Sequence, residues 1–418
     1  MYAALVRSFT HRSTGDPNIE KATYYQIQAS HKSRTLFPNL MEIYCQDGWE
    51  EVYFLLSPSL RRVVISNDQR TNLFSRSVSV FVNALPKICP DIQSLEVYAD
   101  LPISALRSIQ NLTKLHYLGL NFLAPLPSND EYITGLSALP NLRLLKFSAL
   151  LLHPSEPSLW KSQPLSNSPE SFCALRQLDF FAPLDVIANA LPSFLSPNLT
   201  MAFSAEVMCT SSTDDEDHSI PTEQLWSEVC NTLVKHARSP STSLRELLIT
   251  ALPINVLPTG VKAFHPLLGL HGLETLIFII PLEDFEDETL GDWASAWPNL
   301  KTFELTSSES FITLSGIIKL LQLCRGLKKL KLGFDASELY FIPEIPGPPT
   351  PSLCHRLKDW DISRTQVSQY TLGPVMDILR WVFLDLESIK SCSADVEDLP
   401  SEVLPHTLKR ISRERPRW

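Results

Sequence analysis

The sequence predicts an α/β solenoid, in which strand–turn–helix units of similar length stack side by side. Three observations support this prediction: a short apolar block recurs along the chain, its copies keep one internal registration, and helically spaced apolar stretches lie between copies. Self-similarity at a period of tens of residues is the signature of a stacked-repeat protein. One such unit cannot bury its own apolar face, whereas stacking against its neighbours creates a continuous core.

The recurring block is an apolar residue, two further residues, and then Leu-x-x-Φ-x-Φ, where Φ is apolar. In the copy Cys324–Leu332 the anchor is Leu327, and we number the anchor as position one, so that positions four and six are also apolar. Clear copies start three residues before their anchors, at Phe37, Cys89, Leu112, Leu139, Leu270, Trp297, Cys324 and Cys354. Weaker copies have anchors at Leu60, Leu175, Leu199, Leu244, Leu386 and Leu408.

Each block alternates as a short strand does, because Leu330 and Leu332 face one side while Lys329 and Lys331 face the other. Helical spacing occurs at Leu73–Leu85, Tyr132–Leu139, Leu225–Val234, Leu314–Leu323 and Val375–Phe383, and Ser128–Glu131 has capping-box form. This combination predicts a leucine-rich-repeat solenoid, with a curved parallel sheet on the inner face and helices on the outer face. A doubly wound α/β domain also alternates strands and helices, but it has no reason to repeat one registration.

The copies predict one irregular repeat domain over residues 36–411, after an N-terminal segment or cap at 1–35 and before a basic tail at 412–418. Loops that interrupt the repeats are expected at 153–171, 208–221 and 342–352. The consecutive carboxylates of Asp214–Asp217 lack the spacing of a calcium loop, so we interpret them as solvated. The prolines from Pro343 to Pro351 indicate a stiff connection, and a Pro-x-x-Pro ligand for another protein stays open.

Composition excludes several functional classes. A net charge of −10 gives no support for nucleic-acid binding. The longest apolar run, Leu276–Leu282, is too short to span a bilayer, and the N-terminus lacks the cleavage context of a secretory signal. We therefore expect a monomeric protein of the cytoplasm or nucleus that does not engage membranes.

No catalytic motif is present in the sequence. Its 13 glycines form no dinucleotide fingerprint, and neither G-x-S-x-G nor H-E-x-x-H occurs.

Cys89, Cys324 and Cys354 occupy a position that Leu, Phe or Trp fills in other copies, which predicts core packing. Without any C-x-x-C pair, neither zinc nor disulfides are expected. We expect no enzyme, no cofactor and no metal, although an active site assembled across repeats stays open.

Positions three, five and seven of the blocks predict the surface that meets a partner. Exposed aromatic residues beside charges of changing sign are typical of a protein-binding face. A merely polar strand surface is the alternative interpretation. The candidate partner-binding residues on this inner face are Glu96, Tyr98, Tyr117, Asn121, Lys146, Gln177, Asp179, Phe181, Glu304, Thr306, Lys329, Lys331, Asp359 and Asp361.

The C-x-x-L-x-x-L-x-L form at Cys89, Cys324 and Cys354 resembles the cysteine-containing repeats of F-box/leucine-rich-repeat proteins. The Pro-Asn-Leu variants at 38–40, 140–142 and 298–300 are common in the same group. The segments around Leu282–Asp287, Trp297–Lys301 and Trp381–Phe383 look like the fungal, basidiomycete-like members. The resemblance covers roughly residues 36–411.

This resemblance implies a substrate receptor of an SCF-type ubiquitin ligase, in which an F-box holds a Skp-type adaptor and the repeats present a protein for ubiquitination. Nothing before Phe37 resembles an F-box, which argues against binding of the adaptor. The alternative is a repeat-only scaffold or inhibitor unconnected to ubiquitin ligation. The usual repeat asparagine is also replaced, by Asp100 and Asp335 among others, so we expect irregular curvature.

Overall fold

The structure is a computed structural model that describes residues 5–12, 26, 36–46, 53, 55–66, 72–99, 101–122, 135–149, 172–195, 199, 202–208, 222–237, 244–251, 258–306, 312–335, 357–362 and 388–390. The chain forms two compact units. Unit 1 comprises Met1–Ser219 with Arg238–Thr242, and unit 2 comprises Ile220–Ala237 with Ser243–Trp418. The predicted loops 153–171 and 342–352, the tail 412–418 and all of 208–221 except Met208 lie outside the described residues.

The strands of unit 1 pair in parallel and follow one another in chain order. Each crossover therefore leads to the next strand, as in a solenoid and unlike a doubly wound sheet. The strands are β1 (Ser8–Arg12), β2 (Glu42–Gln46), β3 (Arg62–Ser66), β4 (Ser94–Tyr98), β5 (Tyr117–Phe122), β6 (Leu144–Ala149), β7 (Gln177–Pro183) and β8 (Ala202–Met208).

Position four of every repeat in unit 1 is in direct register with its neighbours. The aligned residues are Phe9, Ile43, Val63, Leu95, Leu118, Leu145, Leu178 and Phe203. From Ile43 to Phe203 these side chains are buried, as are the residues at position six from Cys45 to Ala205. The registration that the sequence predicted is thus the registration of the sheet.

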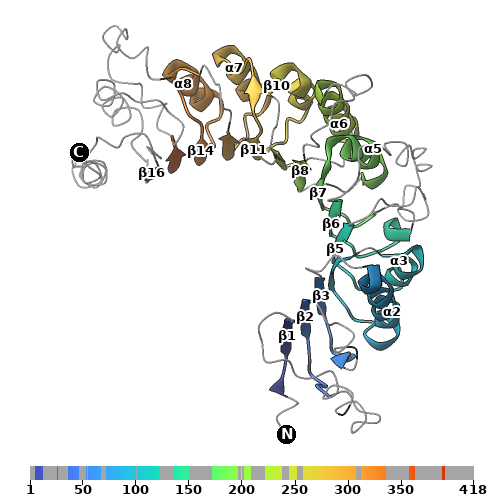
Figure 1. Ribbon diagram of the computed structural model, residues 1–418. Helices are drawn as coiled ribbons and strands as arrows, with labels where there is room; N and C mark the ends of the chain where they lie inside the picture. Colours follow the sequence, from blue (N-terminus) through green and yellow to red (C-terminus); the bar gives the residue numbers. More distant parts are fainter. Residues whose placement is uncertain are drawn as a thin grey trace, which may run out of the picture. The chain divides into compact units, whose positions relative to one another are not determined.

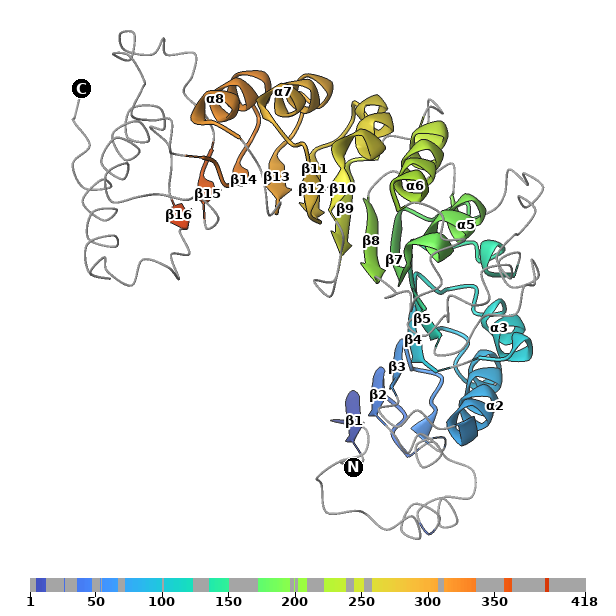
Figure 2. The ribbon, with the colours of Figure 1, turned by 45° about the horizontal axis from the view of Figure 1, so that its top comes forward.

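Helices lie on one face of the unit 1 strands: α2 (Asn72–Ile88), α3 (Ile103–Ile109) and α5 (Leu184–Phe194) (Figures 1 and 2). The face of α2 that is buried carries Val78, Phe81, Val82 and Leu85, which follow helical spacing. Under α5, the ring of Phe194 packs against Phe147 and Phe180 at centroid distances of 5.6 and 5.5 Å. The other face of the strands carries no described helix.

Unit 2 repeats the same plan. Its strands β9 (Glu246–Ala251), β11 (Thr275–Ile279), β13 (Thr302–Leu305), β14 (Lys329–Lys331), β15 (Asp359–Asp361) and β16 (Ser388–Lys390) pair in parallel and in this order. Position four again aligns, through Leu247, Leu276, Phe303, Leu330, Trp360 and Ile389. A separate two-stranded pair joins β10 (Thr259–Gly260) to β12 (Leu282–Glu283).

The helices of unit 2 also share one face of its strands: α6 (Thr222–Ala237), the 3-10 helix η4 (Val261–Gly269), α7 (Asp287–Ala296) and α8 (Leu314–Leu323) (Figure 2). Aromatic rings fill the space beneath them. Trp293 lies 5.5 Å from Phe278 and 5.3 Å from Trp297, measured between ring centroids. Trp297 is fully buried and its Nε1 donates to the carbonyl of Leu267 at 3.3 Å.

A tight turn precedes the strand in most repeats and links it to its neighbour. The anchor N–H donates to the carbonyl three residues earlier, as from Leu327 to Cys324 at 3.1 Å and from Leu300 to Trp297 at 3.2 Å. The carbonyl at position two then accepts two N–H groups from the next repeat. That of Lys301, for example, receives Lys328 and Lys329 at 2.7 and 3.1 Å.

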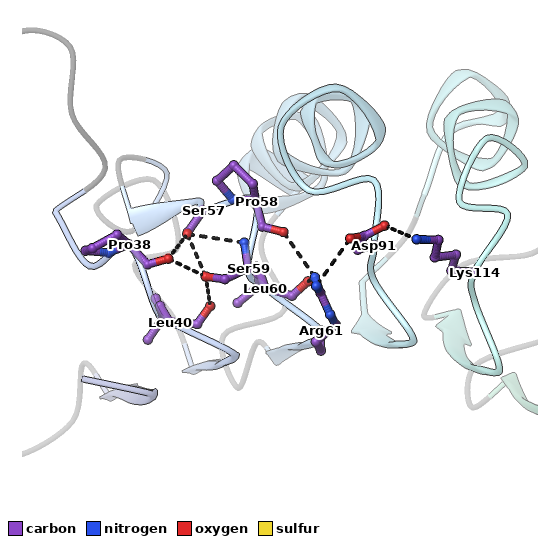
Figure 3. Close-up of polar contacts among 9 residues, drawn as sticks. All are labelled: Pro38, Leu40, Ser57, Pro58, Ser59, Leu60, Arg61, Asp91 and Lys114. Atoms are coloured by element: carbon purple, nitrogen blue, oxygen red, sulfur yellow. Dashed lines mark hydrogen bonds and ion pairs between the residues drawn. The ribbon is translucent and has the colours of Figure 1, made fainter. Parts of the chain in front are cut away.

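Side chains reinforce these turns at the start of unit 1 (Figure 3). Ser57 Oγ and Ser59 Oγ donate to the carbonyl of Pro38 at 3.0 and 2.6 Å. Arg61, at position two, donates to the carbonyl of Leu60 at 3.1 Å and pairs with Asp91 at 3.2 Å (Figure 3). At least this position-two cation therefore has a structural role.

The α/β leucine-rich-repeat fold predicted from the sequence is confirmed, and three of the expected helices correspond to α2, α6 and α8. The expected helix at Tyr132–Leu139 appears only as a helical turn at residues 135–137 within the described part, and Val375–Phe383 and Ser128–Glu131 lie outside it. The strand after Leu199 departs from the block, because Phe203 rather than Ala202 aligns with Leu178. One extra residue thus places a ring in the core instead of a methyl group, which buries more apolar surface.

The structure also contains elements that the sequence analysis did not predict. Strand β1 lies within the segment expected to precede the repeats. The carbonyl of Arg7, directly before β1, accepts the N–H groups of Met41 and Glu42 at 2.7 and 3.0 Å, as the carbonyl at position two does in the other repeats. The helices α3, α5 and α7 and the 3-10 helix η4 were likewise not expected.

Candidate functional site on the strand face

We call the surface opposite the helices, formed by positions three, five and seven, the strand face. All fourteen predicted partner-binding residues lie on it, because each alternates along its strand with buried core positions. Most are half-buried, while Lys146 and Lys329 are exposed. Their role in binding stays a prediction.

Glu96 is the centre of a polar–aromatic cluster in unit 1. It accepts a hydrogen bond from Tyr98 Oη at 3.0 Å and pairs with Arg62 at 3.5 Å. Its side chain is 15% exposed, against 52% for Arg62. Glycine at position 119 makes this arrangement possible, because a Cβ there would lie 3.1 Å from Glu96 Cγ and 3.4 Å from Tyr117 Oη.

The electrostatic character of this cluster is visible in two tyrosines. Burial, the negative charge of Glu96 and, for Tyr98, its hydrogen bond to Glu96 raise the pKa of Tyr98 and of Tyr117 to about 12. For Tyr117, Asp179 adds to the effect and Arg62 opposes it. Both hydroxyls therefore stay protonated over the whole physiological range and remain hydrogen-bond donors.

Residues at the same position of adjacent strands form rows across the strand face. The row at position seven contains Tyr98, Asn121, Ser148 and Phe181. Asn121 Oδ1 and Ser148 Oγ are buried and have no hydrogen-bond partner among the residues that the structure describes. Ser148 is only 4% exposed although it lies on this face. Buried polar atoms in native proteins are nearly always hydrogen-bonded, so this pair requires an explanation.

Asp179 lies on the neighbouring row, at position five, two strands from Gly119. Gln177 Nε2 donates to both of its carboxylate oxygens at 3.3 Å. Burial nevertheless raises the pKa of Asp179, against the opposing effects of Gln177 and Lys146. The surroundings therefore stabilise the ionised carboxylate of Asp179 less than water stabilises that of an exposed aspartate.

The strand face of unit 2 is charged and paired. Lys331 donates to Glu304 across adjacent strands. Lys329 is the Cα partner of Asp359, and Lys331 is the partner of Asp361. Opposite charges therefore lie directly across neighbouring strands, an arrangement that favours their mutual attraction.

Sequence reasoning missed three residues that complete the unit 1 cluster. Arg62 and Gly119 contact Glu96, and Tyr44 lies close enough to raise the pKa of Tyr98. Tyr44 and Arg62 follow the same alternation as the predicted residues, so extending it to β2 and β3 identifies them. Gly119 lacks a side chain and gives no such signal.

The cysteines behave as core residues. Cys89 and Cys324 are fully buried, and burial raises the pKa of each thiol to about 12, which disfavours the nucleophilic thiolate. Cys324 Sγ donates to the carbonyl of Trp297 at 3.4 Å, which ties one repeat to the previous one. The core packing predicted for these two cysteines is confirmed, and Cys354 lies outside the described residues.

No group of three or more His, Cys, Asp or Glu side chains among the described residues could hold a metal ion. Among the described helices, none combines the length and the apolar character needed to cross a membrane.

Fold and site together define a leucine-rich-repeat solenoid whose strand face carries no described helix. No protein-family model matches the sequence, and no curated protein matches it. Among solved structures, an internalin of Listeria monocytogenes matches with a TM-score of 0.38 and 14% identity, over 88% of this chain and 93% of the internalin. A leucine-rich-repeat protein of Leptospira interrogans matches with a TM-score of 0.24 and 16% identity, over 79% of this chain and 90% of its own.

Proposed function

We propose that this chain is a non-enzymatic recognition protein that binds another protein through the strand face of unit 1. The observation that carries the proposal is the cluster of half-buried aromatic side chains, Tyr44, Tyr98, Tyr117 and Phe181, beside incompletely satisfied polar groups. Aromatic residues supply most of the energy of protein interfaces because they bury a large area at low entropic cost. A strand face that was merely solvated would not need them.

Affinity capture with matched variants tests this proposal. Tyr117→Ala combined with Phe181→Ala removes two rings from the strand face, whereas Val80→Ala removes an apolar group that is 61% exposed on helix α2. We expect a protein retained by the wild-type chain and by Val80→Ala to be lost with the double variant. Equal retention by all three chains would contradict a role for the strand face.

We infer further that the partner is a substrate of ubiquitin ligation, with the chain as its receptor in the cytoplasm or nucleus. The C-x-x-L form at Cys324 and Cys354 supports this inference through its resemblance to F-box/leucine-rich-repeat proteins. The competing role is a monomeric scaffold or inhibitor without a ligase. Co-purification with a Skp-type adaptor and a cullin distinguishes the two, since a scaffold retains neither.

A further inference from the structure

The strand face of unit 1 contains two buried polar atoms that no described residue satisfies. Asn121 and Ser148 are direct Cα partners on β5 and β6, and each has a buried oxygen without a partner. Leaving a buried polar atom unpaired destabilises the folded chain. Asn121 Oδ1 can only accept, and the Ser148 hydroxyl can accept or donate, so a donor group of a bound partner would suit both atoms.

The surroundings of these two atoms limit the chemistry of that donor. Tyr98 and Phe181 flank them in the same row, so an aromatic side chain lies on each side of the pair. Glu96 and Asp179 lie in the adjacent row, on β4 and β7, with the side-chain-free Gly119 on β5 and the exposed Lys146 on β6 between them. Acceptors, carboxylates and ring faces all favour a cation that donates several hydrogen bonds.

The two described cations nearest to these atoms, Arg62 and Lys146, leave them unsatisfied. Arg62 reaches Glu96 from β3, at the far side from Ser148, and is about half exposed. Lys146 lies near enough to Asp179 to lower its pKa, but burial dominates and the pKa of Asp179 remains raised. Neither side chain donates to Asn121 Oδ1 or Ser148 Oγ.

We propose that the patch formed by Glu96, Tyr98, Asn121, Ser148, Asp179 and Phe181 receives an arginine side chain of the protein partner. This proposal rests on the function proposed above and specifies the chemistry of that same face. Arginine fits better than lysine, because its planar guanidinium has five N–H donors, stacks on aromatic rings and is weakly hydrated. Both atoms are buried in the free chain, so the side chains that cover them must move when the arginine binds.

A titration with small probes tests the proposal without a known partner. N-acetylarginine amide, N-acetyllysine amide and N-acetylcitrulline amide are added to the full chain, and the side-chain amide signal of Asn121 is followed by nuclear magnetic resonance. Citrulline is the matched control, because it keeps the shape of arginine and loses its charge. We expect saturable shifts with arginine and at least tenfold weaker binding of the other two probes.

Variants then locate the binding site. Glu96→Gln and Asp179→Asn should each weaken arginine binding about tenfold, whereas Glu304→Gln, which alters a paired carboxylate in unit 2, should leave it unchanged. Binding of citrulline or lysine as tightly as arginine would overturn the proposal, and so would equal weakening by Glu304→Gln. The wild-type comparison of the three probes remains decisive even if a variant does not fold.

The outcomes separate this inference from the function on which it rests. If a partner is captured through the strand face but the arginine probe shows no preference over citrulline, the arginine assignment is wrong and the binding function stands. If the Tyr117→Ala, Phe181→Ala chain captures the same proteins as the wild type, the proposed function itself fails.

Discussion

At the scale of single residues, core positions hold buried apolar side chains, whereas positions of the strand face hold partly exposed polar and aromatic ones. Trp297 occupies the site three residues before an anchor, where it is fully buried and donates its N–H to Leu267. Lys331, on a strand of the same unit, is half-buried and paired with Glu304. Substitutions at the two positions should therefore affect different properties of the protein.

Trp297→Asp should destabilise unit 2 severely, by about 3–5 kcal/mol, because it removes a buried ring and leaves an unpaired charge. Lys331→Glu should change stability by only about 0.5–1 kcal/mol, as expected for a partly exposed pair. Urea unfolding followed by circular dichroism measures both. Equal midpoints for Trp297→Asp and the wild type would show that the repeat registration is wrong.

Tyr98 and Tyr117 predict a specific response to alkaline pH. The pKa of each is about 12 in the folded chain, whereas the pKa of a tyrosine in an unfolded chain is about 10. Between these values the folded state holds protons that the unfolded state has lost, so stability falls as the pH rises and is unaffected at lower pH.

Tyrosinate absorbance during a pH titration checks this prediction. We expect a late-titrating fraction of the ten tyrosines, reduced by one residue in Tyr117→Phe and absent in denaturant. If all tyrosines of the native chain titrate together with those of the denatured chain, the cluster around Glu96 is not formed as described.

The sequence predicted the residues of the strand face but not its unsatisfied atoms. Alternation along one strand is enough to place Tyr98, Asn121 and Phe181 on the same side. Whether Asn121 and Ser148 find hydrogen-bond partners depends on which strands are adjacent and how they align, and Ser148 was not among the candidates at all. That information arises only when the repeats are stacked.

At the scale of elements, a side-chain clamp joins consecutive helices of unit 2. Asp287, in the first turn of α7, accepts hydrogen bonds from Thr313 N, at 2.8 Å, and from Thr313 Oγ1. Thr313 in turn caps α8 by accepting the Gly316 N–H at 3.3 Å. A Cβ at residue 316 would overlap the Asp287 carboxylate, so this helix start requires glycine.

The clamp predicts a change of sign in a double-mutant cycle. Asp287→Ala alone should cost about 2 kcal/mol, because it removes hydrogen bonds to a charged acceptor. Gly316→Ala should destabilise the wild-type chain, since the Asp287 carboxylate cannot move without losing Thr313. In the Asp287→Ala chain the same substitution should stabilise by up to about 1 kcal/mol, through helix propensity. Thermal unfolding of the four chains measures the cycle, and the same sign in both backgrounds would rule out the clamp.

The predicted and missed helices differ in the strength of their local signals. Helix α8 has regular apolar spacing and a threonine cap, and its predicted bounds, Leu314–Leu323, are those observed. Helix α5 contains Pro192 and η4 contains Pro266, which normally argue against a helix. Helix α3 has only seven residues and no side-chain cap, so packing against its neighbours rather than its own sequence stabilises it. Strand β1 was missed because Val6 replaces the anchor leucine.

At the scale of the whole molecule, the two units are each compact, and within each unit the strands of the main sheet pair only with those of adjacent repeats. In such an arrangement stability is approximately a sum of repeat and nearest-neighbour terms. A local defect therefore loosens the repeats beside it and has little effect on distant repeats. The domain boundaries expected from the sequence stay a prediction, as does the irregular curvature.

Hydrogen exchange of two matched variants tests this locality. Trp297→Asp places a charge in the core of unit 2, and Leu118→Asp places one in the core of unit 1, where Leu118 is fully buried. We expect Trp297→Asp to accelerate amide exchange in β11, β13 and β14 while β3–β6 keep wild-type protection, and Leu118→Asp to give the reverse pattern. Mass spectrometry of peptic fragments measures both patterns under native conditions. Uniform loss of protection throughout the described strands, in either variant, would mean that the repeats unfold as one cooperative body and that nearest-neighbour stacking does not describe their stability.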